Sequence, residues 1–576
     1  MRTALRAIPL LCALLVVGAC QKADDSGTVT TDTTVAHEVD FAEPALPAAA
    51  EAPPSAGDTV GYDMAIPQAD REGYARIVEN EFQDAAATPL STFAIDVDAA
   101  SYANVRRFLL NEGRMPPADA VRIEELVNYF DYDYPAPRGD VPFSITTEVG
   151  PAPWNPEHRL VHVGLQGRRM DAASLPPANL VFLIDVSGSM DSPDKLPLLK
   201  DAFGMLVDNL RPRDRVSIVV YAGAAGLVLP PTPGSAKDRI RDAIATLQPG
   251  GGTNGGEGIQ LAYRLARDAF LRGGNNRVIL ATDGDFNVGV SSDAELVRMI
   301  EREREGGIFL TVLGFGTGNL QDAKMEQLAD RGNGNYAYID GADEARKVLV
   351  GEMGGTLFTI AKDVKVQVEF NPALVRAYRL IGYENRLLAA QDFNDDTKDA
   401  GELGAGHSVT ALYEVVPVGA SDNPARAVDP LRYQQTRPRS PLRNAVNRLA
   451  DRLGGSPPAS GELLNVKLRY KAPDGHVSRL LSHPLRDRGA SLASASADFR
   501  FSAAVAAWGM LLRDSRFRGD ASYGEVARLA RGALADDRGG YRAEFLRLVE
   551  ASRQASTPYA RREEGGDREE VTITDR

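Results

Sequence analysis

The spacing of apolar positions changes several times along the chain, and each change predicts a different kind of structure. From residue 180 onward, short continuous apolar runs alternate with segments of helical spacing. The helical segments carry apolar residues three or four positions apart, as in Ile240, Ile244 and Leu247. Such alternation is typical of an α/β fold with a doubly wound, mostly parallel sheet and helices on both faces. The predicted strands are 180–184, 216–221, 278–282, 308–315 and 336–339.

Segments with strict apolar–polar alternation lie on both sides of this block. Residues 143–149 and 161–165 precede it, and residues 364–370, 409–415 and 464–470 follow it. One apolar face per segment predicts half-buried antiparallel strands. We therefore expect the α/β domain to be inserted into an antiparallel β-sandwich.

Helical spacing also occurs at both ends of the folded part. We expect a strand at 92–98, helices at about 102–111 and from 116 onward, and a short helix near 71–82. Residues 498–552 carry two apolar stripes and predict a C-terminal helical region. The predicted divisions are a leader (1–19), a disordered tether (20–88), an N-terminal helical and β region (89–172), the α/β domain (173–352), a β-sandwich region (353–490), a helical region (491–555) and a charged tail (556–576).

The charge of the chain excludes one large class of partners. With 79 acidic and 65 basic residues, the net charge is −14, whereas nucleic-acid binding needs a basic surface. The glycines of residues 250–256 suggest a phosphate loop only by composition, because no Gly-Lys-Ser or Gly-Lys-Thr follows them. Neither nucleic acid nor nucleotide is therefore expected.

The N-terminal segment has the pattern of an export signal. Arg2 and Arg6 precede an apolar stretch at 8–17, which is too short to span a bilayer, and Val17-Gly18-Ala19-Cys20 follows. This sequence resembles the bacterial lipobox, which implies cleavage before Cys20 and a lipid anchor on its sulfur. Gln21 in place of Asp favours the outer membrane of the cell envelope, on its periplasmic face. The alternative is an ordinary secretory signal with a chance cysteine.

Polar side chains follow two of the predicted strands and one glycine-rich loop. Asp185-Val186-Ser187-Gly188-Ser189 follows the strand at 180–184, Asp283 follows the strand at 278–282, and Thr253 stands among glycines. In a doubly wound sheet, ligands bind beyond the carboxyl ends of the strands. Oxygen ligands with few carboxylates suit Mg²⁺, and Mn²⁺ as an alternative.

This pattern resembles the metal-ion-dependent adhesion site of the von Willebrand factor type A domain. The resemblance implies that Ser187 and Ser189 coordinate the ion directly, Asp185 and Asp283 directly or through water, and Thr253 when a ligand is bound. The alternative is a degenerate domain that binds no metal. The order of the whole chain resembles bacterial envelope lipoproteins with a central type A domain and a C-terminal domain of unknown function.

The expected function is therefore that of a membrane-anchored, non-enzymatic adhesion or scaffold lipoprotein. Its site would capture a Glu or Asp of a protein partner through the divalent cation. One alternative is a component that recruits substrates for a separate ATPase, which a lipid anchor outside the inner membrane disfavours. Another is a metal-dependent hydrolase, for which the sequence offers no evident general base.

Two further groups of residues could be taken for metal sites. Residues 392–396 with Asp399 could hold Ca²⁺, but they lack the glycine and glutamate of an EF-hand loop, and a solvated acidic turn is the alternative. His158 and His162 on one strand would lie roughly 13 Å apart, at about 3.3 Å per residue. We expect both histidines to be ordinary hydrogen-bonded side chains.

Overall fold

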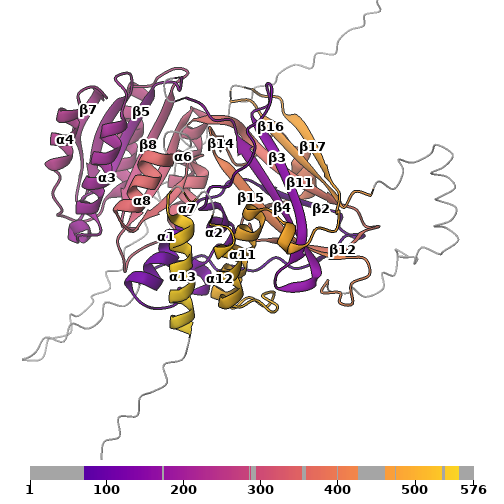
Figure 1. Cartoon of the computed structure of the whole chain (residues 1–576). Helices are drawn as coiled ribbons and strands as arrows, with labels where there is room; N and C mark the ends of the chain where they lie inside the picture. Colours follow the sequence, from indigo (N-terminus) through magenta and orange to yellow (C-terminus); the bar gives the residue numbers. More distant parts are fainter. Residues whose placement is uncertain are drawn as a thin grey trace, which may run out of the picture. The chain divides into compact units, whose positions relative to one another are not determined.

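The central sheet of the computed structural model has the order β10-β9-β8-β5-β6-β7. Figure 1 labels β7, β5 and β8 of this sheet. All neighbouring strands are parallel except β6 and β7, which are antiparallel. Every residue of β5 is buried, which explains why it reads as an unbroken apolar run. The edge strand β7 was not expected, because its prolines disguise it. The strands are β5 (Ala178–Asp185), β6 (Arg215–Tyr221), β7 (Ala225–Pro233), β8 (Asn275–Thr282), β9 (Ile308–Phe315) and β10 (Tyr336–Ile339).

Helices cover both faces of this sheet, as the sequence predicted. Phe182 and Ile184 of β5 pack with α3 (Leu196–Asn209), α4 (Lys237–Ala245) and α8 (Ala342–Arg346). Val181 and Leu183, pointing the opposite way, pack with α5 (Gly255–Asp268), α6 (Asp293–Glu305) and α7 (Asp322–Arg331). The chain leaves β5 for β6 on one side and later returns to β8 on the other. The carboxyl ends of β5 and β8 therefore form the topological switch point at which such sheets bind ligands.

Two antiparallel sheets form the sandwich. In the part of the chain that the structure describes, their orders are β1-β12-β15-β4-β3 and β13-β2-β11-β16-β17, with β14 paired to β11. Their inner faces share one core, in which Val163 of β4 and Val366 of β11 take part. Because β4 precedes the α/β domain and β11 follows it, the predicted insertion is confirmed. The strands are β1 (Gln83–Asp84), β2 (Leu90–Ala94), β3 (Phe143–Ala152), β4 (Asn155–Gly167), β11 (Thr359–Phe370), β12 (Val375–Ile381), β13 (Leu387–Leu388), β14 (Leu403–Gly404), β15 (Ser408–Pro417), β16 (Leu464–Lys471) and β17 (Arg479–Leu485).

The N-terminal and C-terminal helices share a second core beside the sandwich. Trp508 of α11 is fully buried, and its ring meets Phe545 of α13 edge to face at 5.1 Å. Leu126 and Phe130 of the N-terminal region belong to the same core. The helices are α1 (Ala100–Arg106), α2 (Ile123–Asn128), α11 (Ala497–Leu512), α12 (Tyr523–Arg531) and α13 (Tyr541–Ser556), with the shorter turns η1 (Arg107–Asn111), η2 (Ala118–Ala120), η3 (Gly188–Asp191), η4 (Lys347–Glu352), η5 (Ala390–Asn394) and η6 (Leu492–Ser494).

Residues 71–88 differ from what the sequence predicted. The segment 71–82 contains no helix, and it is bonded to the α/β domain instead of forming part of a free tether. The Arg71 and Gly73 amides donate to the carbonyls of Gly318 and Leu320, at 3.2 and 2.8 Å. Hydrogen bonds to a distant part of the chain thus order this segment without a helix, and low apolar periodicity was a poor guide here.

The structure describes residues 71–171, 174–284, 286, 293–352, 358–398, 400–425, 461–473, 475–534, 537 and 539–556. The predicted leader, Cys20, most of the predicted tether, Asp399 and all but the first residue of the charged tail lie outside this set. Within it, no helix has the length and apolar character that crossing a membrane requires.

Candidate metal centre

Asp185 is the most constrained carboxylate of the predicted site. It ends β5 and is fully buried. Its Oδ1 accepts the Ser187 amide at 2.9 Å, and its Oδ2 accepts the hydroxyls of Tyr221 at 3.1 Å and Thr282 at 3.2 Å. Burial raises the pKa of this carboxyl to about 6, although the hydrogen bonds act in the opposite direction. Neighbours on β6 and β8 therefore fix the carboxylate at the switch point.

The two serines lie in the turn that follows. Ser187 is buried, Ser189 is exposed, and their Oγ atoms lie 3.0 Å apart. The turn is fastened to the glycine-rich loop by the Gly188 amide, which donates to the Gly251 carbonyl at 3.2 Å. Gly251 has φ +83°, a conformation that favours glycine. The bond from Gly188 to Gly251 therefore holds the loop that carries Thr253 beside the turn with the two serine hydroxyls.

Asp283 follows β8 and is buried. Its Oδ2 accepts a hydrogen bond from the Lys195 ammonium at 2.9 Å, and the same ammonium donates to the Ser189 carbonyl at 2.9 Å. The lysine stem passes Gly316, where a side chain would meet it. Sequence reasoning missed Lys195, because a lysine at the start of a helix normally points to solvent.

The donor set fits the chemistry of a hard divalent cation. Asp185 ends β5, Ser187 and Ser189 lie in the turn after it, Asp283 follows the adjacent strand β8, and the Thr253 loop is bonded to that turn. Carboxylate and hydroxyl oxygens are the ligands that Mg²⁺ and Mn²⁺ prefer. The Lys195 ammonium supplies a positive charge at the same place, so a cation would share Asp283 with it.

The other residues considered for metal binding have other partners. His158 Nδ1 lies 2.6 Å from Glu414, and His162 lies 2.6 Å from the Tyr134 hydroxyl and 2.9 Å from Ser502. Both histidines are thus hydrogen-bonded side chains, as expected.

Three backbone carbonyls of the acidic loop at 392–396 already accept hydrogen bonds from lysines. Lys365 donates to the Asp392 and Asp395 carbonyls, and Lys471 donates to the Asp396 carbonyl at 2.7 Å. Because Ca²⁺ sites use such carbonyls, this arrangement favours the acidic turn.

One buried carboxylate cluster was not expected. Ligand atoms of Asp98, Glu125 and Glu326 lie within 4.8 Å of one another. Arg122 pairs with Glu125 and Asp322, and Arg386 pairs with Glu326 at 3.1 Å. Two guanidinium groups therefore already neutralise part of the cluster, which acts as an ion-pair network between α2 and α7.

Three protein families match successive parts of the chain. Residues 179–349 match the family described as von Willebrand factor type A domain, and residues 355–555 match Uncharacterized protein YfbK, C-terminal. Residues 68–162 match a family described as von Willebrand factor.

Several individual proteins are similar to this chain. The uncharacterized protein YfbK of Escherichia coli (strain K12) is 44% identical over 485 residues, which cover 83% of this chain and 80% of that protein. Inter-alpha-trypsin inhibitor heavy chain H4 of Homo sapiens is 32% identical over 161 residues, 27% of this chain and 17% of that protein. Among solved structures, von Willebrand factor type A from Catenulispora acidiphila is 14% identical, with a TM-score of 0.37, over 83% of this chain and 91% of that chain.

Proposed function

The chain belongs to the family of the Escherichia coli protein YfbK, with a central von Willebrand factor type A domain, and we propose that it is a non-enzymatic protein-binding lipoprotein of the bacterial cell envelope. Type A domains typically bind proteins. In this proposal, the binding site is the rim of the central sheet, and the ligand is a Glu or Asp of a protein partner.

The observation that carries the proposal is the convergence of oxygen donors at the switch point. Asp185, Ser187 and Ser189 stand at the end of β5, and Asp283 stands at the end of the adjacent strand β8. These residues, with Thr253, would hold Mg²⁺ or Mn²⁺. A bound ion with few carboxylate ligands remains a Lewis acid, so a carboxylate of the partner can coordinate it as a further ligand. Ser189 is exposed, so a partner can reach this rim.

The second part of the proposal is the attachment to a membrane. Cys20 would carry acyl chains, each buried CH₂ contributing roughly 0.8 kcal/mol. Residues between Cys20 and Arg71 would then separate the anchor from the folded part. The favoured location is the outer membrane, facing the periplasm.

Cation binding is tested first, by isothermal titration calorimetry with MgCl₂ and MnCl₂. We expect one site in the native protein, and an affinity at least about tenfold weaker in Asp185→Asn and Ser187→Ala. Ser192→Ala is the matched control, because this nearby hydroxyl bonds Asp194 and belongs to the same turn region. Equal affinity in all four proteins would refute the assignment of the donors.

Partner binding is tested by capture from native membranes with Mg²⁺ or with EDTA, beside Asp283→Ala. Capture that persists in EDTA and in the variant would show that the metal does not bridge the partner. Fractionation of Cys20→Ala tests the anchor separately, since loss of acylation should release the protein from the membrane fraction.

A further inference from the structure

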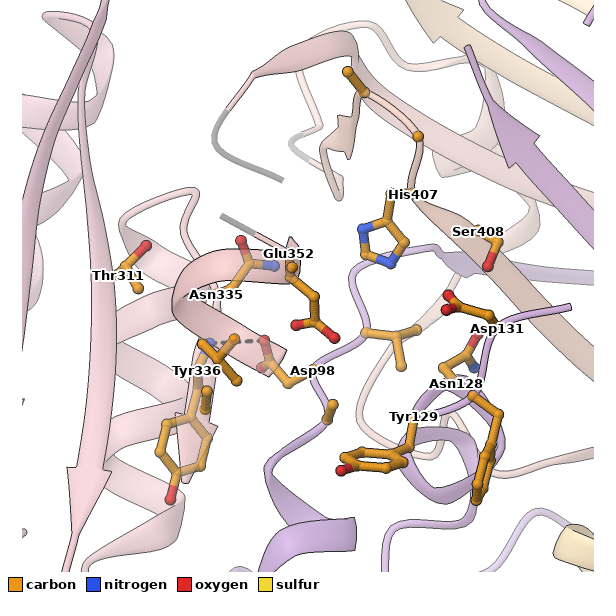
Figure 2. A pocket seen from close by; sticks show the side chains of 18 of the residues that line it. Asp98, Asn128, Tyr129, Asp131, Thr311, Asn335, Tyr336, Glu352, His407 and Ser408 are labelled. Atoms are coloured by element: carbon orange, nitrogen blue, oxygen red, sulfur yellow. Dashed lines mark hydrogen bonds between the residues drawn. The ribbon is translucent and has the colours of Figure 1, made fainter. Parts of the chain in front are cut away.

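A cavity of about 420 Å³ lies away from the metal centre (Figure 2). It reaches Asn335 and Tyr336 at the amino end of β10, whereas Asp185 and Asp283 follow the carboxyl ends of their strands. Its volume lies within the range of small-molecule binding sites, roughly 300–1,000 Å³. The cavity is therefore large enough for a ligand and separate from the rim.

Five parts of the chain supply its walls, one of which is the segment between β4 and β5 with Arg169, Met170 and Leu175. The other four are the segment before α1, the residues at and after the end of α2, the sheet of the type A domain with η4, and the loop before β15. Figure 2 shows Asp131, Glu352 and His407 directed toward the space between these parts. A ligand here would touch elements on both sides of the domain insertion.

Three polar groups of the cavity have unused hydrogen-bonding capacity. The Asp131 carboxylate is exposed, and it has no hydrogen bond or ion pair with any described residue. The His407 ring likewise has no hydrogen-bond partner in the described ranges, and burial lowers its pKa to about 4, which leaves it neutral at pH 7. Asp98 is 4% exposed; its Oδ1 accepts the Tyr336 amide at 2.8 Å, and its Oδ2 accepts no hydrogen bond but lies 3.7 Å from the Arg386 guanidinium. Such groups favour a ligand that offers donors.

The charge of the lining determines the kind of donor. Asp98, Asp131 and Glu352 are acidic; Arg169 lines the cavity, and Lys347 lies close enough to act electrostatically on Asp131 and His407. Glu352 also pairs with Lys347, so Asp131 is the carboxylate most available to a ligand. A positively charged donor therefore matches this wall better than an anion would.

The rest of the lining is apolar or aromatic. A bare metal ion would gain nothing from these surfaces, whereas the hydrocarbon part of an organic cation would be removed from water against them. The Tyr129 ring already has the Lys347 ammonium 4.1 Å from its centroid, so the lining offers apolar contact and not a vacant aromatic face. The residues concerned are Val97, Tyr129, Phe130, Met170, Leu313 and Val348.

We propose that this cavity binds an organic ammonium or guanidinium group that carries a short apolar chain, with Asp131 and His407 contacting the cationic head. The same chemistry occurs in a free amine and in a lysine or arginine side chain of a protein. The proposal is independent of the metal centre.

Isothermal titration calorimetry on the folded protein tests it with pentylamine and with the tripeptide amide acetyl-Gly-Lys-Gly-NH₂. Pentan-1-ol and the norleucine tripeptide are the uncharged counterparts. We expect at least one cationic probe to bind about tenfold or more tightly than its counterpart. Binding of pentylamine alone identifies a free amine as the ligand, and binding of the tripeptide alone identifies a protein side chain.

Asp131→Asn should weaken binding of the cationic probe about tenfold and leave the uncharged one unchanged. Asp133→Asn is the matched control, because this exposed aspartate changes the charge equally but does not line the cavity. Asp283→Ala should bind the amine as the native protein does. Absence of binding, equal binding of charged and uncharged probes, insensitivity to Asp131→Asn, or loss in Asp283→Ala would each overturn the proposal.

Discussion

The ammonium of Lys195 lies 2.9 Å from the buried carboxylate of Asp283. It also donates to the Ser189 carbonyl, so one lysine links the turn after β5 to the end of β8. The protein thus carries a positive charge of its own beside the proposed cation site. A divalent cation bound at the proposed site would stabilise the same carboxylate as this ammonium.

Replacing this lysine tests that relationship. Lys195→Met removes the ammonium from beside a buried carboxylate and should lower the free energy of unfolding by about 3 kcal/mol in EDTA. MgCl₂ should then raise the melting temperature of the variant more than that of the native protein, because the ion replaces the lost charge. Lys200→Met is the control, since among the described residues Lys200 donates to the carbonyls of Ala245 and Leu247 and to no carboxylate. An equal response to MgCl₂ in all three proteins would contradict the prediction.

The residue after Asp283 has no room for a side chain. Gly284 has φ +109°, and a Cβ there would lie 2.5 Å from the Asn319 carbonyl and the Gln321 amide. Gly284→Ala should therefore lower the free energy of unfolding by about 2–4 kcal/mol and weaken Mn²⁺ binding. In Gly273→Ala, where φ is +68° and no atom lies within 4 Å, backbone strain alone should cost about 1 kcal/mol. Equal losses in the two variants, measured by urea unfolding, would contradict the steric argument.

The ion-pair network between α2 and α7 gives a third prediction. Arg122 is buried and pairs with Asp322 and Glu125, so Arg122→Met should lower the free energy of unfolding by about 3–5 kcal/mol. The exposed pair of Arg331 and Glu301 should be worth less than about 1 kcal/mol, which makes Arg331→Met the control. Amide hydrogen exchange should rise first in α7. Unchanged exchange there would mean that the network does not hold the helix.

The periodicity of apolar residues predicted the fold well where the pattern of burial stays the same along a whole strand or helix. The buried strand β5 reads as an unbroken apolar run, and β16 alternates as a half-buried strand does. The sequence of β11 also alternates, but Lys365 and Gln367 on its polar side are buried, so this strand is not half-buried as predicted. The strand β7 was missed because it contains prolines, which are unusual in strands, although its partner β6 directly precedes it. The segment 71–82 was missed because its hydrogen-bond partners lie far away in the sequence.

The candidate site was predictable for a related reason. Asp185 and Asp283 each follow an apolar strand, and parallel strands bring their carboxyl ends to one edge. Lys195 was not predictable, since only the folded chain shows its stem beside Gly316. The cavity around His407 was beyond sequence reasoning, because five separate segments meet there.

A buried histidine gives the last prediction, for the dependence of stability on pH. Burial lowers the pKa of His162 to about 4, and its ring is bonded to Tyr134 and Ser502. In the unfolded chain this histidine takes up a proton below about pH 6.5, whereas the folded state resists it down to about pH 4. The contribution of this group to the free energy of unfolding should therefore be fully retained above pH 6.5 and fall by about 3 kcal/mol as pH drops to 4.

In His162→Gln, urea unfolding between pH 7.5 and 4.5 should show a correspondingly shallower loss of the free energy of unfolding. The exposed His476 provides the control, because His476→Gln should keep the native slope. A native slope in His162→Gln would assign the acid sensitivity to other groups.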